Sequence, residues 1–181
     1  MPTRALILLA DGFEEIEAIA VIDILRRADI KLSTVSLELK LVTSARNIVL
    51  KTDHLIEEIP AFDYDMLVLP GGGEGVKNLK ENDHVKSLIK RFDAEGKYIA
   101  AICAAPLVLE EIGLLKNKKV TSYPNVATDL KSAQWIDETV VVDGKLVTSQ
   151  SPTTAIEFAL SLVELLKSKE VRQSVEKAII Y

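Results

Sequence analysis

The sequence is poor in cysteine, histidine and aromatic residues. Its 181 residues include one cysteine, Cys103, two histidines and 5% aromatic side chains. A single cysteine cannot form an internal disulfide bond, so we expect a reducing, cytoplasmic compartment. His54 and His84 both lie in polar stretches and precede Cys103 in the chain. These positions disfavour a catalytic Cys–His pair and a metal site, and we expect no bound metal ion.

Long hydrophobic runs and an excess of positive charge are also lacking. The apolar stretches fall well short of the roughly 18–20 residues that cross a bilayer, and the N-terminus has no secretory signal pattern. The net charge is −5, and the 22 basic residues are scattered among 27 acidic ones. Nucleic-acid binding needs a concentrated basic surface. We therefore expect neither a membrane nor a nucleic acid to be the main partner.

The chain is rich in apolar residues, which make up 48% of it, and no repeat or linker divides it. These features predict one domain over residues 1–181. Short apolar runs alternate with helical patterns, which is typical of a flavodoxin-like α/β sandwich: a mostly parallel sheet with helices on both faces. We expect strands at 5–9, 31–37, 48–51, 66–69, 98–102 and 120–123, a hairpin at 139–148, and helices at 14–28, 83–95, 103–112, 153–166 and 170–179.

The cysteine follows the apolar run 98–102 directly, and Pro106 suits the first turn of a helix. Small residues surround Cys103, as in a nucleophile elbow, where a strand turns sharply into a helix. The amides at a helix start favour thiolate over thiol, so this position predicts a lowered thiol pKa and a reactive cysteine. The alternative is a buried cysteine that acts as a small hydrophobic residue.

Three loops lie at the carboxyl ends of predicted strands, where α/β sheets bind ligands: residues 11–17, 71–75 and 103–106. The glycine-rich loop 71–75 lacks the Lys-Ser/Thr ending of a nucleotide-binding loop and contains Glu74, so we expect no nucleotide and no other cofactor. Its amides, with that of Ala104, could form an oxyanion hole. A tight strand-to-helix turn is the equally simple alternative.

Three acids crowd the start of the first predicted helix: Glu14, Glu15 and Glu17. Acids at this position commonly complement the helix dipole, which accounts for Glu14 and Glu15. Helical periodicity allows either Glu14 or Glu17 to face the sheet, and we prefer Glu17 because Glu14 lies at the helix end. A carboxyl group in apolar surroundings stays protonated near neutral pH and can donate a hydrogen bond to a thiolate.

Taken in order, the motifs resemble the ThiJ/PfpI superfamily, and within it the branch of the Parkinson disease protein deglycase and its bacterial relatives. The resemblance implies that Cys103 is an oxidation-sensitive nucleophile, that Glu17 is the protonated acid contacting it, and that the Gly72 and Ala104 amides bind an oxyanion. It rests on Arg4-Ala-Leu, Glu14-Glu-Ile-Glu17, Asp23-Ile-Leu-Arg-Arg-Ala28, Val68-Leu-Pro-Gly-Gly72, Ala100-Ala-Ile-Cys-Ala104, Leu146-Val-Thr-Ser149 and Glu157-Phe-Ala-Leu160.

The resemblance further implies a homodimer and a pocket formed with Gly71, Arg46 and Tyr123. Many members of the branch have a histidine before a proline in the pocket, where this chain has Tyr123-Pro124. A phenol is a poor base at neutral pH, so a mechanism that needs that histidine does not transfer. Ala104 follows the cysteine and no histidine comes after His84, which disfavours peptidase and amidotransferase chemistry.

The resemblance, together with the Cys103 and Glu17 pattern, predicts a cofactor-free enzyme that acts on reactive dicarbonyls. The reaction would convert methylglyoxal to lactate, remove early glycation adducts from proteins, or do both. The alternative is a redox sensor or an oxidation-dependent chaperone in which Cys103 is oxidised without turnover. Both alternatives need the same reactive thiol, and the sequence does not separate them.

Overall fold

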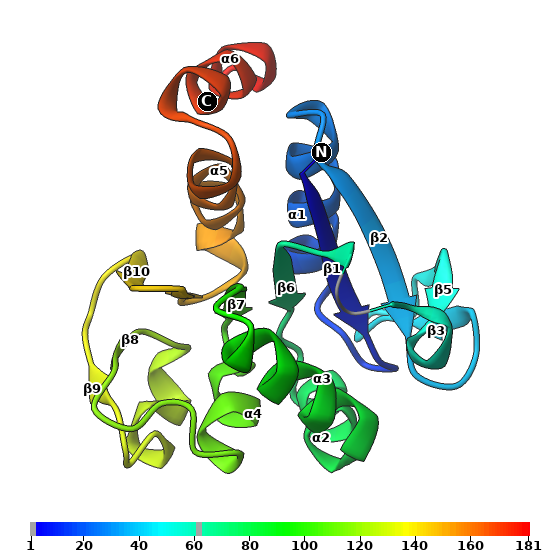
Figure 1. Cartoon of the computed structure of the whole chain (residues 1–181), viewed down its shortest axis with the longest axis vertical. Helices are drawn as coiled ribbons and strands as arrows, with labels where there is room; N and C mark the ends of the chain where they lie inside the picture. The colour runs from blue at the N-terminus through cyan, green and yellow to red at the C-terminus, as the bar shows by residue number, and fades with distance from the viewer. Residues whose placement is uncertain (1–2, 61–62) are drawn as a thin grey trace.

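The structure is a computed structural model that describes residues 3–60 and 63–181. Its centre is a seven-stranded sheet with the order β10-β11-β7-β6-β1-β2-β5 (Figure 1). All neighbouring strands are parallel except β10 and β11, which form an antiparallel hairpin. The strands are β1 (Arg4–Leu9), β2 (Lys31–Ser36), β5 (His54–Leu55), β6 (Met66–Leu69), β7 (Tyr98–Ile102), β10 (Val140–Asp143) and β11 (Leu146–Ser149).

Helices cover both faces of this sheet. On one face lie α1 (Glu15–Arg27) and α5 (Ala155–Leu166), with α6 (Lys169–Ile179) packed on α5. On the other lie α2 (Gly73–Glu81), α3 (Asp83–Ala94) and α4 (Pro106–Glu111). The smaller elements are β3 (Leu41–Thr43), β4 (Val49–Lys51), β8 (Lys119–Val120), β9 (Gln134–Trp135) and the 3₁₀ turns Ile56–Glu58, Pro124–Asp129 and Pro152–Thr154.

The alternation of side chains along β1 explains the two apolar layers. Ala5, Ile7 and Leu9 belong to the cluster beneath α1 and α5, whereas Leu6 and Leu8 belong to the cluster beneath α2, α3 and α4. Successive side chains of a strand point to opposite faces, and every one of these five is fully buried. The predicted mostly parallel sheet with helices on both faces is confirmed.

Differences from the expected elements are local. The loop after β6 is shorter than expected, because α2 begins at Gly73. The sequence had indicated no helix between residues 69 and 83. Residues Pro152–Thr154 form a 3₁₀ turn before α5 begins at Ala155. The expected strand at 120–123 is reduced to the two residues of β8.

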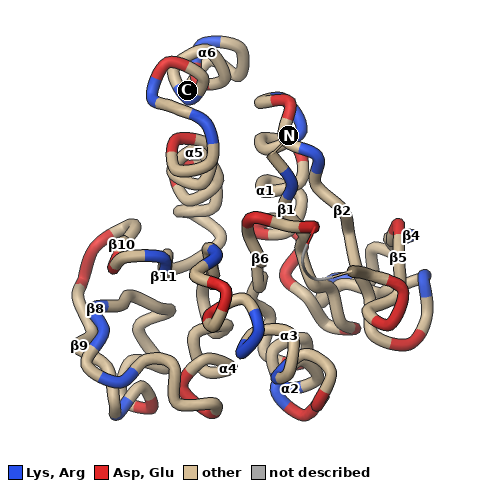
Figure 2. Tube along the Cα trace, in the orientation of Figure 1, with Lys and Arg blue, Asp and Glu red and all other residues tan. Residues whose placement is uncertain are grey.

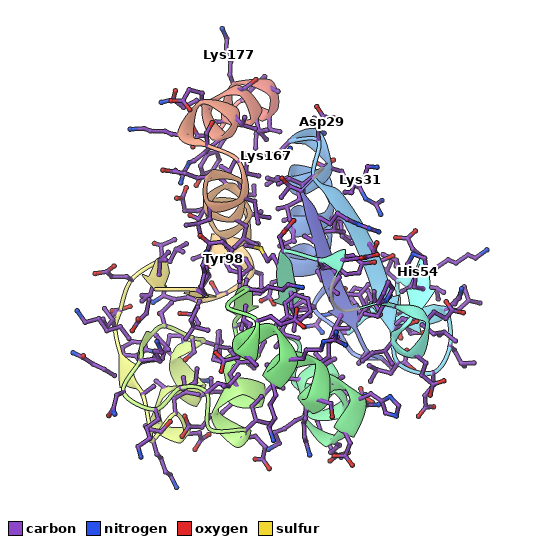
Figure 3. All side chains as sticks on the ribbon, in the orientation of Figure 1. Asp29, Lys31, His54, Tyr98, Lys167 and Lys177 are labelled. Carbon is purple, nitrogen blue, oxygen red and sulfur yellow. The ribbon has the colours of Figure 1, made fainter. Side chains whose placement is uncertain are left out.

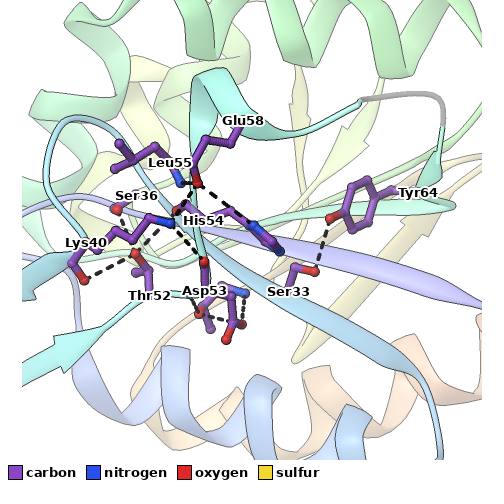
Figure 4. A network of polar contacts seen from close by, with 10 residues as sticks. Ser33, Ser36, Lys40, Thr52, Asp53, His54, Leu55, Glu58 and Tyr64 are labelled. Atoms are coloured by element: carbon purple, nitrogen blue, oxygen red, sulfur yellow. Dashed lines mark hydrogen bonds and ion pairs between the residues drawn. The ribbon is translucent and has the colours of Figure 1, made fainter.

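The edge of the sheet at β5 is held by polar contacts (Figure 4). Asp53 accepts hydrogen bonds from the Thr34 backbone and hydroxyl at 2.9 and 2.8 Å. The ammonium group of Lys40 lies 2.9 Å from the carboxylate of Glu58, so the segment between β2 and β3 is tied to the 3₁₀ turn that follows β5.

The C-terminal helix lies far from the edge at which β1 and β6 end (Figure 1), and Lys177 on it points away from the rest of the molecule (Figure 3). Among the helices formed by residues 3–60 and 63–181, none has both the length and the apolar character that crossing a membrane requires.

Candidate active site

Cys103 lies in the sharp turn that joins β7 to α4. Its φ angle is +64°, a conformation that non-glycine residues rarely adopt and that stores strain. The Cys103 amide donates to the Ser149 carbonyl at 3.0 Å, and the Tyr123 amide donates to the Cys103 carbonyl at 2.8 Å. These bonds hold the strained turn, which is the predicted nucleophile elbow. The cysteine is partly exposed rather than sealed in the core.

Glu17, on α1, lies beside the sulfur and against the loop after β6. Its side chain is fully buried, and Oε2 accepts a 2.7 Å hydrogen bond from the Gly71 amide. Its carboxyl group lies beside the Cys103 thiol, and its Oε1 atom has no hydrogen-bond partner within the described residues. Glu14 caps α1 instead, with its Oε2 accepting from the Glu17 amide at 2.8 Å. Of the two acids that periodicity left open, Glu17 is therefore the one beside the cysteine.

The glycines after β6 allow the Glu17 side chain to lie close to the Cys103 thiol. A Cβ atom on Gly71 would lie 2.6 Å from both the Cys103 Cβ and the Glu17 Oε2. A Cβ atom on Gly72, whose φ is +92°, would lie 2.3 Å from the Gly12 carbonyl oxygen. Only glycine fits either position, because a larger residue would push the backbone away from the thiol or from the loop after β1.

Burial raises the pKa of both reactive groups. The pKa of Glu17 rises from 4.5 to about 7 because the carboxyl group is buried, although its contacts with Gly71 and Cys103 oppose the rise. The pKa of Cys103 rises from 9.0 to about 12, first because the thiol is buried and second because the Glu17 carboxylate lies beside it. The predicted lowering of the thiol pKa by the helix start alone is therefore wrong, since α4 is short and burial outweighs it.

Glu17 and Cys103 are not both ionised at the same time, because each desolvated anion destabilises the other. The thiolate consequently needs the proton to be on Glu17. Once Glu17 is protonated, its charge no longer opposes the thiolate, and the amides of Ala104 and Gly72, which donate to the sulfur and lower its pKa, act without that opposition. The arrangement is a pair of bases that share one proton.

Of the remaining predicted pocket residues, Tyr123 contacts the elbow and Arg46 does not. Tyr123 is connected to the elbow through its backbone amide, and 40% of the residue is exposed. Arg46 is exposed in the loop between β3 and β4, where its guanidinium donates to the Ala45 carbonyl at 3.2 Å. Among residues 3–60 and 63–181 it has no hydrogen bond or ion pair with Cys103 or Glu17.

Sequence reasoning missed Glu15. Its position at the start of a helix indicated a solvated acid, but only 8% of the residue is exposed. Neither of its carboxylate oxygens has a hydrogen-bond partner within the described part of the chain. It lines a groove with Ile16, Ile19, Ile48 and Ile156, which are 40–57% exposed. No signal in a single sequence distinguishes this acid from Glu14, because only packing determines which one is covered.

Comparisons with known proteins identify the family of this chain. The DJ-1/PfpI family matches residues 3–165. The chain belongs to this family. It is 39% identical to Protein dj-1beta of Drosophila melanogaster over 183 residues, which cover 99% of this chain and 98% of that protein. The crystal structure of that fly protein superposes with a TM-score of 0.96, at 40% identity and with 99% and 98% of the two chains covered.

Two further relatives show the breadth of the family. The chain is 34% identical to a protein of Schizosaccharomyces pombe (strain 972 / ATCC 24843) named "Glutathione-independent glyoxalase DJ-1", with 97% of each chain covered. It is 38% identical to Protein DJ-1 homolog B of Arabidopsis thaliana, over 98% of this chain but only 41% of that protein. The chain thus spans about two fifths of the length of the plant relative.

Proposed function

We propose that the protein is a cofactor-free enzyme that converts methylglyoxal and related dicarbonyls to hydroxy acids. The observation that carries this proposal is the buried Glu17 carboxyl group beside Cys103, which lies in a strained elbow. A pKa of about 7 suits a group that must both give and take a proton at neutral pH. The glyoxalase name of the fission yeast relative supports the same chemistry.

The first step is addition of the Cys103 thiolate to the aldehyde carbon of methylglyoxal. The carbon–sulfur bond forms as the carbonyl π bond breaks, and the proton held by Glu17 passes to the aldehyde oxygen. This produces a hemithioacetal and leaves Glu17 as a carboxylate. In this proposal the Gly72 and Ala104 amides, which lower the pKa of the thiol in the free protein, donate to the developing oxyanion.

The second step moves a proton between the two carbons of the adduct. The Glu17 carboxylate removes the proton from the former aldehyde carbon and delivers it to the ketone oxygen, which gives an enediol. Reprotonation of the neighbouring carbon and loss of the hydroxyl proton then give a lactoyl thioester on Cys103. One carbon is oxidised and the other is reduced, so no external oxidant is needed. Water cleaves the thioester, releases lactate and returns the thiol.

Replacement of the cysteine tests this proposal most directly. We expect Cys103→Ala to form lactate from methylglyoxal no faster than buffer, because the covalent intermediate cannot form. His84→Ala, which removes an exposed histidine on α3, serves as the matched control and should retain wild-type turnover. Lactate is measured by a coupled dehydrogenase assay after removal of residual methylglyoxal. Undiminished turnover by Cys103→Ala would sink the proposal.

A redox function is the second candidate, because the same two amides that donate to the sulfur could hold the oxygens of a cysteine sulfinate. Peroxide treatment followed by intact mass spectrometry would show whether two oxygen atoms add at Cys103. A protein that gains them readily, suppresses client aggregation only afterwards and never turns over methylglyoxal would fit this candidate instead of the enzyme.

We also propose that the protein is a homodimer through the groove beside Glu15. Isoleucine side chains of α1 and of the β3–β4 loop are exposed there. They surround the buried Glu15 carboxylate, which has no partner in the described residues. An exposed apolar surface of this kind is typical of a protein–protein interface. Arg46 lies two residues before Ile48, so a second copy would bring a guanidinium group to this face. Sedimentation equilibrium should give a dimer for the wild type and for Leu39→Asp, and a monomer for Ile16→Asp. A monomeric wild type would contradict this arrangement.

A further inference from the structure

A cleft separate from the Cys103 site opens where β1 and β2 end. Its volume is about 390 Å³, within the range of small-molecule sites. Its walls are residues 9–11 at the end of β1, residues 36–39, 41 and 42 around the connection from β2 to β3, and residues 78, 81 and 82 at the end of α2. Both strands run side by side to this edge (Figure 1), which is the edge at which parallel sheets bind ligands. Neither Cys103 nor Glu17 lines it.

The charge of the cleft has one sign. Asp11, Glu38 and Glu81 contribute carboxylates, and no lysine, arginine or histidine is part of the lining. None of these three acids forms an ion pair within residues 3–60 and 63–181. Two nearby lysines are engaged elsewhere: Lys40 pairs with Glu58 (Figure 4), and Lys80 lies 4.0 Å from Glu111. The cleft therefore attracts cations.

Two hydrogen bonds fix the geometry of its acidic wall. The Oδ1 atom of Asp11 accepts from the Thr43 amide at 2.8 Å, and the side-chain amide of Asn78 donates to the Asp11 carbonyl at 2.9 Å. The Oδ2 atom of Asp11 has no hydrogen-bond partner in the part of the chain that the structure describes. A carboxylate held this way loses little freedom when it receives a charged donor, so binding there costs less conformational entropy.

Other residues of the lining are apolar. Leu39 is 72% exposed and Leu41 is 61% exposed, among the largest exposed fractions for leucine or isoleucine in the described residues. Leu37 and Val42 continue this surface toward the core. Exposed leucines beside unpaired carboxylates match a ligand that has a charged head and a short hydrocarbon tail.

We propose that this cleft binds a small organic cation, an ammonium or guanidinium group carried on a short apolar chain. The cationic head lies among Asp11, Glu38 and Glu81, and the chain lies along Leu39 and Leu41. Anions are repelled by the carboxylates, and a neutral chain of the same length leaves those carboxylates unpaired. The volume accommodates a free small molecule rather than a folded segment of a partner protein.

Three probes of equal length separate the contributions of head and tail: hexylamine, hexan-1-ol and hexanoate. Titrated at pH 7 into the full ¹⁵N-labelled chain, hexylamine should give saturable amide shifts confined to residues 9–11, 36–42 and 78–82. Hexanol should bind at least about fivefold more weakly, and hexanoate should not bind. Equal binding of hexanol and hexylamine, or shifts that do not saturate, would overturn the proposal.

Charge-matched variants complete the experiment. The double variant Glu38→Gln with Glu81→Gln should weaken hexylamine binding about three- to tenfold. Glu57→Gln with Glu138→Gln removes the same charge from exposed positions outside the cleft and should leave the affinity unchanged. An equal loss in both double variants would mean only general charge attraction. Tighter binding of Nα-acetyl-lysine methylamide than of hexylamine would identify a protein side chain as the occupant and overturn the assignment to a free small molecule.

Discussion

Two buried carboxylates on the first turn of α1, two residues apart, lie in opposite circumstances. Glu17 receives a hydrogen bond from the Gly71 amide and contacts the Cys103 thiol. Glu15 is almost as well buried, yet neither of its oxygens has a partner in residues 3–60 and 63–181. A buried charge without a partner is costly. Glu17 is thus anchored within its own chain through one of its two oxygens, whereas both oxygens of Glu15 are left for a partner from outside the chain.

The largest effect expected from this comparison is the loss of activity on neutralising Glu17. We expect Glu17→Gln to lower kcat for methylglyoxal by about 10²- to 10⁴-fold, the usual contribution of a general acid–base group. The amide keeps the size of the side chain but cannot exchange a proton. Glu15→Gln, measured in the same lactate assay, should change kcat much less. Equal losses of kcat in the two variants would contradict the assignment of the acid–base role to Glu17 alone.

The raised pKa of Glu17 also makes stability depend on pH. Between pH 4.5 and about 7 the folded protein holds a proton on Glu17 that the unfolded chain has released. The free energy of unfolding therefore falls as the pH rises through this window, by up to about 3 kcal/mol. Urea unfolding at pH 5, 6, 7 and 8 measures it, and Glu17→Gln should show a smaller fall. Parallel pH profiles for the wild type and Glu17→Gln would show that Glu17 is not the source of the pH dependence.

The close approach at Gly71 predicts the next largest effect. Gly71→Ala should lower the free energy of unfolding by about 1–3 kcal/mol, because its Cβ would overlap Cys103 and Glu17. Gly73→Ala is the matched control, since a Cβ there has no atom within 4 Å and its φ is not positive. Urea denaturation should separate the variants, and lactate formation should fall only in the first. Equal stabilities of the two variants would show that the site accommodates an added methyl group at residue 71.

The smallest effect concerns Glu15 and the proposed dimer. Glu15→Gln should weaken dimerisation about tenfold, because a carboxylate that receives a partner's cation is replaced by a neutral amide. Analytical ultracentrifugation over a dilution series measures the change, with Glu57→Gln as an exposed control. If dimerisation instead tightens, Glu15 is an unpaired charge in the assembly as well as in the single chain.

Much of this architecture follows from local patterns. The helix expected at 83–95 is α3, and its four apolar positions Val85, Leu88, Ile89 and Phe92 are all buried. The strands 66–69 and 98–102 appear with the expected bounds. Helix α2 was missed because its first turn contains Gly73 and Gly75, which lower helix propensity. Contacts with the loop after β1, where Gly75 lies against Phe13, compensate for that weakness.

The sequence by itself determined the elbow, because a short apolar strand, small residues and a proline at the start of a helix impose it locally. It also determined the alternation of the main strands and helices, although not α2, since hydrophobic periodicity is a property of neighbouring residues. The tertiary structure alone decided which acid meets the sulfur, that burial raises the thiol pKa, and that Glu15 is covered without a partner in its own chain. These outcomes depend on desolvation and on distances between segments remote in sequence, which no local pattern encodes.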